Sequence, residues 1–327
     1  MDVLLSIPRA KNLKYKVIYM GGIEGFEAAR VELADTAEVI QVEANTDCLN
    51  AYIGVADAVI DASMKVKIDN AMVDSAPRLK VISCATTGSD HIDRESVDAR
   101  GINVNTLKED RELLQNLTPA AELSWALLMA CARKLPQALK HVKSGEWVRE
   151  CFPGTMLNGK QLGLIGFGRI GGWMARYGQA FGMTVVCNDP YAESIPDFVQ
   201  SVSLERLMES SDFISVHVHL SDDTRDLVNE GLLCEVKEGA VLINTSRGDI
   251  ISQNGLLKVL ESGRLGAAGL DVIQGEPDID QNPLVQYARE HDNLLITPHI
   301  GGFSPDAVTV VCKRAAEKVR KVLGESK

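Results

Sequence analysis

The sequence predicts an α/β protein that contains two doubly wound parallel sheets. Short apolar runs alternate with amphipathic stretches along the chain, a pattern that favours parallel sheets over a sandwich. The 327 residues exceed the length of one average domain, which indicates two units. A glycine-rich turn directly follows an apolar run near the middle of the chain, where the second unit begins.

The first unit is predicted from apolar runs separated by stretches with apolar residues at helical spacing. The predicted strands are residues 3–7, 17–20, 39–42, 58–60, 81–84 and 102–104, and the predicted helices include 23–34, 68–76 and 93–100. This order fits one parallel sheet with helices on both faces.

The second unit begins with a predicted strand at residues 162–165. A glycine-rich turn, a helix and a strand at 185–188 follow it, and the later predicted strands are 213–218, 240–244, 267–271 and 294–297. The two βα units therefore lie in tandem along the chain.

The turn after residue 165 has the spacing of a dinucleotide-binding loop. Gly166 permits a tight turn, Gly168 lets the backbone approach a pyrophosphate, and Gly171 lets the next helix pack closely on the sheet. The helix N-terminus offers free N–H groups to the phosphates. Asp189 ends the next strand, where a carboxylate accepts hydrogen bonds from ribose hydroxyls, so we expect NAD rather than NADP as cofactor.

Between the two units, residues 118–133 predict a buried helix. Thr118 stands at the N-cap, Pro119 at the first helical position, and apolar residues occupy nearly every face. Such a helix either lies inside one chain or buries part of its surface against a second copy. We expect a homodimer through residues 118–134, with the interior position as the alternative.

Charge and cysteine content exclude several classes of function. The net charge of −11 disfavours nucleic acid and anionic membranes as partners. The seven cysteines are scattered and odd in number, which indicates neither a disulfide framework nor a zinc ribbon. The N-terminus has no signal-peptide pattern and no apolar stretch is long enough to span a bilayer, so we expect a cytoplasmic protein.

Three polar residues follow predicted strands of the second unit and so share the edge where doubly wound sheets bind ligands. Arg247 can bind a planar carboxylate through two parallel hydrogen bonds. His299 can exchange one proton near neutral pH, and Glu276 beside it would hold the tautomer and favour the protonated form. Interconversion of a 2-oxo acid and a 2-hydroxy acid requires these groups.

The chain resembles the D-2-hydroxyacid dehydrogenases over almost its whole length. Four segments carry the resemblance in order and spacing: residues 165–171, 244–248, 271–277 and 298–302. It implies Arg247, Glu276 and His299 as catalytic residues, and a Rossmann NAD-binding domain (105–297) inserted into a flavodoxin-like substrate domain (1–104 and 298–327). The cofactor contacts that it implies are Gly166, Gly168, Arg169, Ile170, Gly171, Asp189, Thr245, Ser246, Asp271 and Gly301.

Residues 83–93 resemble the substrate loop of that family, which implies that Thr86, Thr87 and Gly88 bind substrate together with Arg247 and His299. Cys84 stands where some phosphoglycerate dehydrogenases carry arginine, and residues 61–65 lack a second arginine that those enzymes have. We therefore expect no site that binds a substrate phosphate. Phosphoglycerate dehydrogenase activity and an NAD(H)-sensing corepressor-like role remain the alternatives. His217 and His219 lack an evident third ligand, so we assign no metal.

Overall fold

The computed structural model describes residues 14–325, which form two compact α/β units. Unit 1 comprises residues up to 114 together with those from 303 onward, and unit 2 comprises residues 115–302. Both units contain one fully parallel sheet, so the predicted fold class is confirmed. The strand predicted at residues 3–7 lies outside the described residues.

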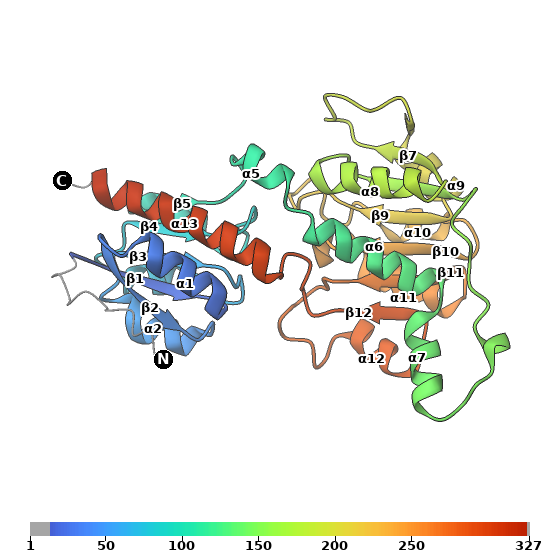
Figure 1. Cartoon of the computed structure of the whole chain (residues 1–327), viewed down its shortest axis with the longest axis horizontal. Helices are drawn as coiled ribbons and strands as arrows, with labels where there is room; N and C mark the ends of the chain where they lie inside the picture. Colours follow the sequence, from blue (N-terminus) through green and yellow to red (C-terminus); the bar gives the residue numbers. More distant parts are fainter. Residues whose placement is uncertain (1–13, 326–327) are drawn as a thin grey trace, which may run out of the picture. The chain divides into compact units, whose positions relative to one another are not determined.

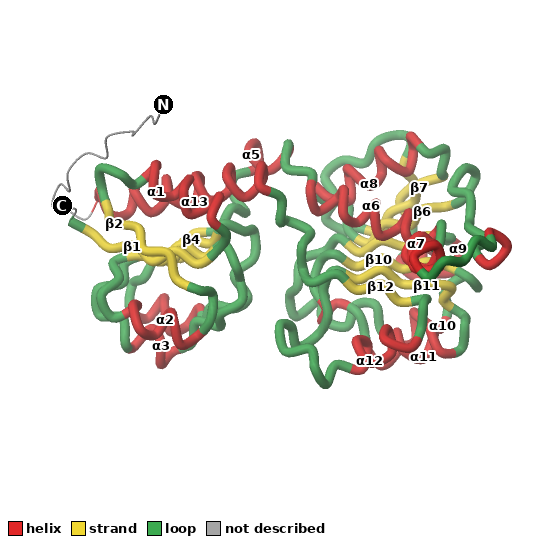
Figure 2. The backbone as a smooth tube through the Cα atoms, turned by 60° about the horizontal axis from the view of Figure 1, so that its bottom comes forward, coloured by secondary structure: helices red, strands yellow, loops and turns green. Residues whose placement is uncertain are grey.

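Unit 1 contains a parallel sheet in the order β2-β1-β3-β4-β5. Helices cover both of its faces, with α1 and α13 on one side and α2 and α3 on the other (Figures 1 and 2). Its elements are β1 (Tyr15–Met20), α1 (Ile23–Glu32), β2 (Ala37–Val42), α2 (Thr46–Ile53), β3 (Ala58–Asp61), α3 (Asn70–Asp74), β4 (Val81–Cys84), α4 (Arg94–Ala99), β5 (Asn103–Asn105) and α13 (Pro305–Glu325). The described strands agree with the predicted positions, whereas α2 was not predicted.

Unit 2 contains a parallel sheet in the order β12-β11-β10-β9-β6-β7-β8, and Figure 2 again shows helices on both faces. Its strands are β6 (Gln161–Ile165), β7 (Thr184–Asn188), β8 (Val199–Ser201), β9 (Phe213–Val216), β10 (Ala240–Asn244), β11 (Leu265–Leu270) and β12 (Leu294–Ile296). Its helices are α6 (Pro119–Ala132), α7 (Leu135–Lys143), η1 (Arg149–Cys151), α8 (Arg169–Ala180), α9 (Leu204–Ser210), α10 (Glu230–Cys234), η2 (Gly248–Ile250), α11 (Gln253–Glu261) and α12 (Pro283–Glu290); α5 (Arg111–Gln115) spans the boundary between the units.

The apolar helix predicted at 118–133 is α6, and it packs within unit 2. Leu127, Leu128 and Cys131 are buried in one cluster with side chains of β6, β10 and α8. This face of α6 is therefore buried within one chain. Glu122 and Ala126 remain exposed on the outer side of the helix.

The unit boundaries lie further along the chain than the resemblance implied. Residues 105–114 contact unit 1, because the Leu107 N–H donates to Thr86 O over 2.8 Å and Arg314 Nε lies 2.7 Å from Asp110 Oδ1. Residues 298–302 belong to unit 2, because the Gly301 N–H donates to Asp271 Oδ2 over 2.7 Å.

Candidate active site

Three neighbouring strands of unit 2 end in register, and the loops that leave them carry the predicted catalytic residues. Asn244 of β10 lies opposite Leu270 of β11, and Leu270 lies opposite Ile296 of β12. Arg247, Glu276 and His299 follow these strand ends in that order along the chain. The strand register therefore brings the three loops to one edge of the sheet, where open α/β sheets bind ligands.

The structure pairs the predicted histidine with the predicted acid. His299 Nδ1 lies 2.7 Å from Glu276 Oε1, and the two side chains keep 38% and 28% of their surface exposed. The carboxylate accepts the proton of Nδ1, which leaves Nε2 as the ring nitrogen that can exchange a proton with a bound molecule. The ring is therefore both oriented and accessible.

The backbone at His299 is held in a left-handed conformation with φ of 54°. A residue other than glycine in this region is strained by about 1–3 kcal/mol and needs support from its surroundings. The His299 N–H donates to Asp271 O over 2.9 Å and to Thr297 O over 3.0 Å. These bonds and the contact with Glu276 hold the turn that presents the imidazole.

Asp271, which directly follows β11, holds that same turn in place through its carboxylate. It is 1% exposed, and its carboxylate accepts hydrogen bonds from Thr297 Oγ1 (2.5 Å), Ile300 N–H (2.9 Å) and Gly301 N–H (2.7 Å). These donors on both sides of His299 fix the loop after β12 to the end of β11. The resemblance alone implied a cofactor contact for Asp271; the structure adds a role in positioning the histidine loop.

Arg247 stands in the tight turn between β10 and η2. Asn244 Nδ2 donates to the Arg247 carbonyl over 2.8 Å, and Arg247 Nη1 donates to Ser246 O over 2.8 Å. The next residue, Gly248, lies so close to the loop after β11 that an added Cβ would meet Ile273 C at 2.2 Å. This contact packs the arginine turn against the segment that leads to Glu276.

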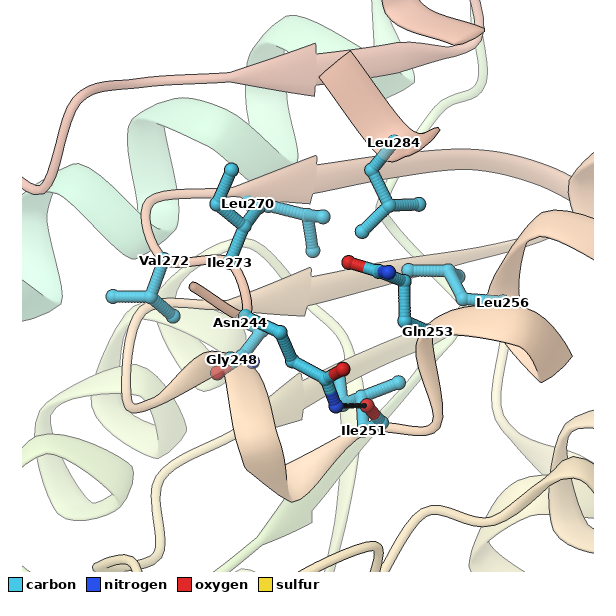
Figure 3. A pocket seen from close by; sticks show the side chains of 10 residues that line it. Asn244, Gly248, Ile251, Gln253, Leu256, Leu270, Val272, Ile273 and Leu284 are labelled. Carbon is cyan, nitrogen blue, oxygen red and sulfur yellow. Dashed lines mark hydrogen bonds between the residues drawn. The ribbon is translucent and has the colours of Figure 1, made fainter. Parts of the chain in front are cut away.

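A small cavity lies behind the arginine turn, lined by residues of β10, η2, β11, α11, α12 and the loops between them (Figure 3). Its volume is about 10 Å³, which corresponds to about one water molecule. Most of its lining is apolar, as Ile251, Leu256 and Leu284 illustrate. It is too small for a 2-oxo acid, so it belongs to the packing that supports the turn.

The glycine-rich turn of unit 2 has the geometry that a dinucleotide needs. Gly166 has a φ of 91°, and a Cβ there would meet His217 O at 2.7 Å. A Cβ on Gly171 would lie 2.3 Å from Gly166 O, whereas a Cβ on Gly168 would meet nothing within 4 Å. Two glycines therefore allow close packing of β6, β9 and α8, and Gly168 leaves open space at the N-cap of α8 where a phosphate can approach.

Asp189, which the sequence predicts to bind the adenosine ribose, directly follows β7. Its Oδ2 accepts the Phe167 N–H over 2.7 Å and its Oδ1 accepts the Tyr191 N–H over 2.9 Å. The carboxylate is thereby fixed beside the glycine turn, and each oxygen retains a lone pair for a ribose hydroxyl. The N-cap of α8 makes no side-chain hydrogen bond, which leaves the first-turn N–H groups for an anion. These residues fit a dinucleotide.

The remaining predicted cofactor residues lie around the same edge of unit 2. Arg169 Nη1 donates to Leu117 O, so its guanidinium connects the start of α8 to the segment before α6. Ser246 Oγ donates to Val216 O over 2.7 Å, and Thr245 Oγ1 lies 2.7 Å from Ser124 Oγ. Ile170 is half-buried in the first turn of α8, and Gly301 is fixed by Asp271. Ser124 thus joins the β10 loop to α6, a connection that the sequence did not indicate.

His217 and His219 follow β9, which ends at Val216 and is shorter than predicted. Both ring nitrogens of His217 are buried without a hydrogen-bond partner among the described residues, and burial lowers the pKa of this imidazole to about 3. His219 is exposed. Within residues 14–325 no three His, Cys, Asp or Glu side chains gather as a metal site would require.

The predicted substrate loop of unit 1 follows β4. Thr86 Oγ1 donates to Gly88 O over 2.9 Å, which closes the loop on itself, and Thr86, Thr87 and Gly88 are all half-buried. No left-handed φ occurs among these residues, so threonine is accommodated at position 86 without glycine. Cys84 is fully buried, and burial raises the pKa of its thiol to about 12.

Comparison with known proteins shows the family. The model of the NAD-binding domain of D-isomer-specific 2-hydroxyacid dehydrogenases matches residues 125–301. The chain is 36% identical to the hydroxypyruvate reductase of Thermotoga maritima, over 81% of this chain and 84% of that protein. It is 35% identical to the D-3-phosphoglycerate dehydrogenase of Methanocaldococcus jannaschii, over 79% of this chain and 48% of that one, so it spans about half the length of this relative.

A solved structure extends the similarity to the whole fold. The D-lactate dehydrogenase of Aquifex aeolicus, in complex with NAD and lactic acid, has a TM-score of 0.80 and 25% identity, and the match covers 94% of this chain and 96% of that one. The sequence similarity, the fold and the pairing of His299 with Glu276 all point to the same family. The chain belongs to the D-isomer-specific 2-hydroxyacid dehydrogenase family and is an NAD-dependent oxidoreductase.

Proposed function

We propose that this protein reduces a small, unphosphorylated 2-oxo acid to the D-2-hydroxy acid, and catalyses the reverse reaction, with His299 as the acid/base. The observation that carries this proposal is the 2.7 Å contact between His299 Nδ1 and Glu276 Oε1, which leaves Nε2 as the proton-exchanging atom. NADH supplies the hydride. In reduction His299 donates a proton to the substrate oxygen, and in oxidation it accepts that proton.

Arg247 binds the substrate carboxylate in this proposal, and Glu276 acts through His299 as a positioning residue. The planar guanidinium offers two parallel donors to a carboxylate, and its turn is held by Asn244 and by the packing of Gly248. The backbone of the loop Thr86–Gly88 supplies the remaining contacts with the anion. This assignment predicts that changes at Arg247 affect every accepted 2-oxo acid alike.

NAD is preferred over NADP because Asp189 stands at the ribose position. A carboxylate fixed by Phe167 and Tyr191 accepts hydroxyl hydrogen bonds and repels a 2′-phosphate. The measurement is kcat/KM with NADH and with NADPH for the parent and for Asp189→Ala. Equal use of both cofactors by the parent would contradict the assignment.

An unphosphorylated substrate is favoured because unit 1 presents no arginine at position 84 or within residues 61–65. Cys84 is fully buried and uncharged, so it offers no cation to a phosphate. The similarity to a hydroxypyruvate reductase points the same way. Phosphoglycerate dehydrogenase relatives make the phosphorylated 2-oxo acid the necessary comparison.

The test is NADH oxidation with glyoxylate, hydroxypyruvate, pyruvate and 3-phosphohydroxypyruvate, with chiral analysis of any product that has a stereocentre. We expect turnover of at least one unphosphorylated acid, a D-product, and a lower kcat/KM for the phosphorylated acid. An L-product, or a preference for 3-phosphohydroxypyruvate, would overturn the corresponding part of the proposal. NADH binding without turnover of any acid would favour the sensing role instead.

The protein also acts as a homodimer in the cytoplasm in this proposal, through residues 118–134 and the adjoining α7. In α7 the apolar side chains of Leu135, Leu139 and Val142 are 49–55% exposed. Trp147, which follows α7, is 87% exposed. Apolar groups that gather in this way indicate a protein contact. Light scattering should give twice the monomer mass for the parent and the monomer mass for Leu139→Glu.

All seven cysteines are unpaired, as in a reducing compartment. Among residues 14–325 no helix has the length and apolar character needed to cross a membrane.

A further inference from the structure

Asp61 ends strand β3 in unit 1 and is fully buried, although it carries a carboxylate. Its Oδ1 accepts hydrogen bonds from the Ser63 N–H and Ser63 Oγ, both over 2.8 Å, and from the Met64 N–H over 3.0 Å. Met64 has a left-handed φ of 56°, which the last of these bonds supports. The orientation of the carboxylate is therefore fixed by the turn that follows β3.

The other oxygen of Asp61 contacts a histidine on a different loop. His91 Nε2 lies 2.8 Å from Asp61 Oδ2, and the His91 side chain is only 10% exposed. Burial opposes ionisation of Asp61, but the contacts with His91 and Ser63 outweigh it and hold the pKa of the carboxyl below its usual value. A charged carboxylate thus stands against an imidazole inside the protein, although the two residues are 30 positions apart in sequence.

Asp61 is attached to both ends of the loop that follows β4. At the start of this loop, the Ala85 N–H donates to the Asp61 carbonyl over 2.8 Å. At its end, the Asp61 carboxylate contacts His91. The His91 carbonyl accepts the Ile68 N–H over 2.9 Å, which adds a second attachment to the segment before α3. Residues 86–90, which include Thr86, Thr87 and Gly88, lie between these attachments.

We propose that Asp61 and His91 are a positioning pair that holds the loop Thr86–Gly88 in the conformation that binds the substrate carboxylate. Asp61 is fully buried and only 10% of the His91 side chain is exposed, so the proposal gives the pair a role through the loop. This inference rests on the proposed function of that loop. It assigns to Asp61 and His91 an effect on the KM for the 2-oxo acid, with little effect on kcat or on NADH binding.

The chain offers a matched control at the opposite end of the same strand. Asp57 directly precedes β3, is 4% exposed, and pairs with Arg78 over 2.9 Å and with the Lys16 N–H over 2.8 Å. It is therefore a buried, paired carboxylate of unit 1 that contacts neither end of the β4 loop. A general loss of stability follows from changing either aspartate, whereas a specific effect on the loop follows only from changing Asp61 or His91.

The first experiment measures KM, kcat and the NADH dissociation constant in parent, His91→Ala, His91→Gln and Asp57→Ala, with the 2-oxo acid that the parent uses best. We expect His91→Ala to raise KM about tenfold, the factor that about 1.4 kcal/mol of lost binding produces. The kcat and the NADH dissociation constant should change less than about threefold, which is less than half of that free energy. His91→Gln keeps a polar side chain that can contact Asp61 and should recover most of the parental KM, while Asp57→Ala should leave KM unchanged.

The second experiment measures hydrogen exchange of the amides of residues 86–92 in the same variants, which requires no turnover. We expect faster exchange in this loop for His91→Ala and no change there for Asp57→Ala. Equal effects of the two alanine variants on KM, or an unchanged loop in His91→Ala, would overturn the positioning role. If the parent turns over none of the acids, the proposed function fails, and the exchange data alone then decide whether the pair holds the loop.

Discussion

Gly171 and Gly172 are adjacent at the start of α8, yet replacing each of them by alanine should change the stability of the protein in opposite directions. In Gly171→Ala the new Cβ lies 2.3 Å from the backbone oxygen of Gly166, a distance that neither group can relieve by rotating a side chain. In Gly172→Ala the new Cβ meets nothing within 4 Å. Both positions lie in the same helix, so both gain the same helix propensity.

The magnitudes follow from these contacts. Replacing glycine by alanine inside a helix stabilises it by up to about 1 kcal/mol. Overpacking costs about 1–3 kcal/mol, and a contact with backbone calls for the upper end of that range. We therefore expect Gly171→Ala to lower the free energy of unfolding by about 2 kcal/mol and Gly172→Ala to raise it by up to about 1 kcal/mol. Displacement of α8 should also weaken NADH binding about tenfold in Gly171→Ala alone.

Urea unfolding followed by tryptophan fluorescence is the appropriate assay. The three tryptophans, Trp125, Trp147 and Trp173, all lie in unit 2, so the signal reports on the unit that carries the substitution. An unchanged dependence of the unfolding free energy on urea would show that only stability has changed. Shifts of the same sign and size in both variants, or tighter NADH binding by Gly171→Ala, would refute the close packing of β6 and α8.

Three further predictions concern single side chains of unit 2. Arg247→Lys keeps the charge but loses the planar pair of donors, so kcat/KM should fall at least tenfold on every accepted 2-oxo acid; near-parental values would make Arg247 structural. Asp271→Asn turns an amide N–H toward a backbone donor and should cost about 1–3 kcal/mol of stability and lower kcat; unfolding curves and steady-state rates measure this. Burial lowers the pKa of His217 in the folded protein to about 3, so only the unfolded state takes up its proton between pH 6.5 and 3, and stability is lost as the pH falls. Between pH 7 and pH 5 this loss should reach about 2 kcal/mol and disappear in His217→Phe, whereas an equal loss in both proteins would contradict it.

The sequence predicted the features that depend on local pattern. Buried strands such as β6 and β10 are continuous apolar runs, and the glycine turn has a spacing that few other structures require. Strand β8 was missed because its three residues, Val199–Ser201, contain one apolar side chain and two polar ones. Helix α7 was not predicted, although Leu135, Leu139 and Val142 stand at helical spacing and mark one apolar face in the sequence.

Features that depend on contacts between distant residues could not be predicted. Glu276 and His299 were named from their motifs, but their 2.7 Å contact requires the register of β11 and β12. The pair Asp61 and His91 was not predicted, because each residue alone is an ordinary polar residue at a strand end or in a loop. Only the parallel pairing of β3 and β4, which places Asp61 opposite Cys84, brings the two loops together.

In the proposed function His299, oriented by Glu276, exchanges the proton of the reaction. Single-turnover oxidation of bound NADH by the preferred 2-oxo acid, compared between parent and His299→Gln, tests this directly because it separates the chemical step from product release. We expect the variant to be slower by about 10²–10⁴-fold, the range that a positioned general acid contributes, while the NADH dissociation constant stays within about twofold, since the ring lies at the end of β12 and not at the glycine turn. An unchanged single-turnover rate in His299→Gln would contradict the acid/base role of His299.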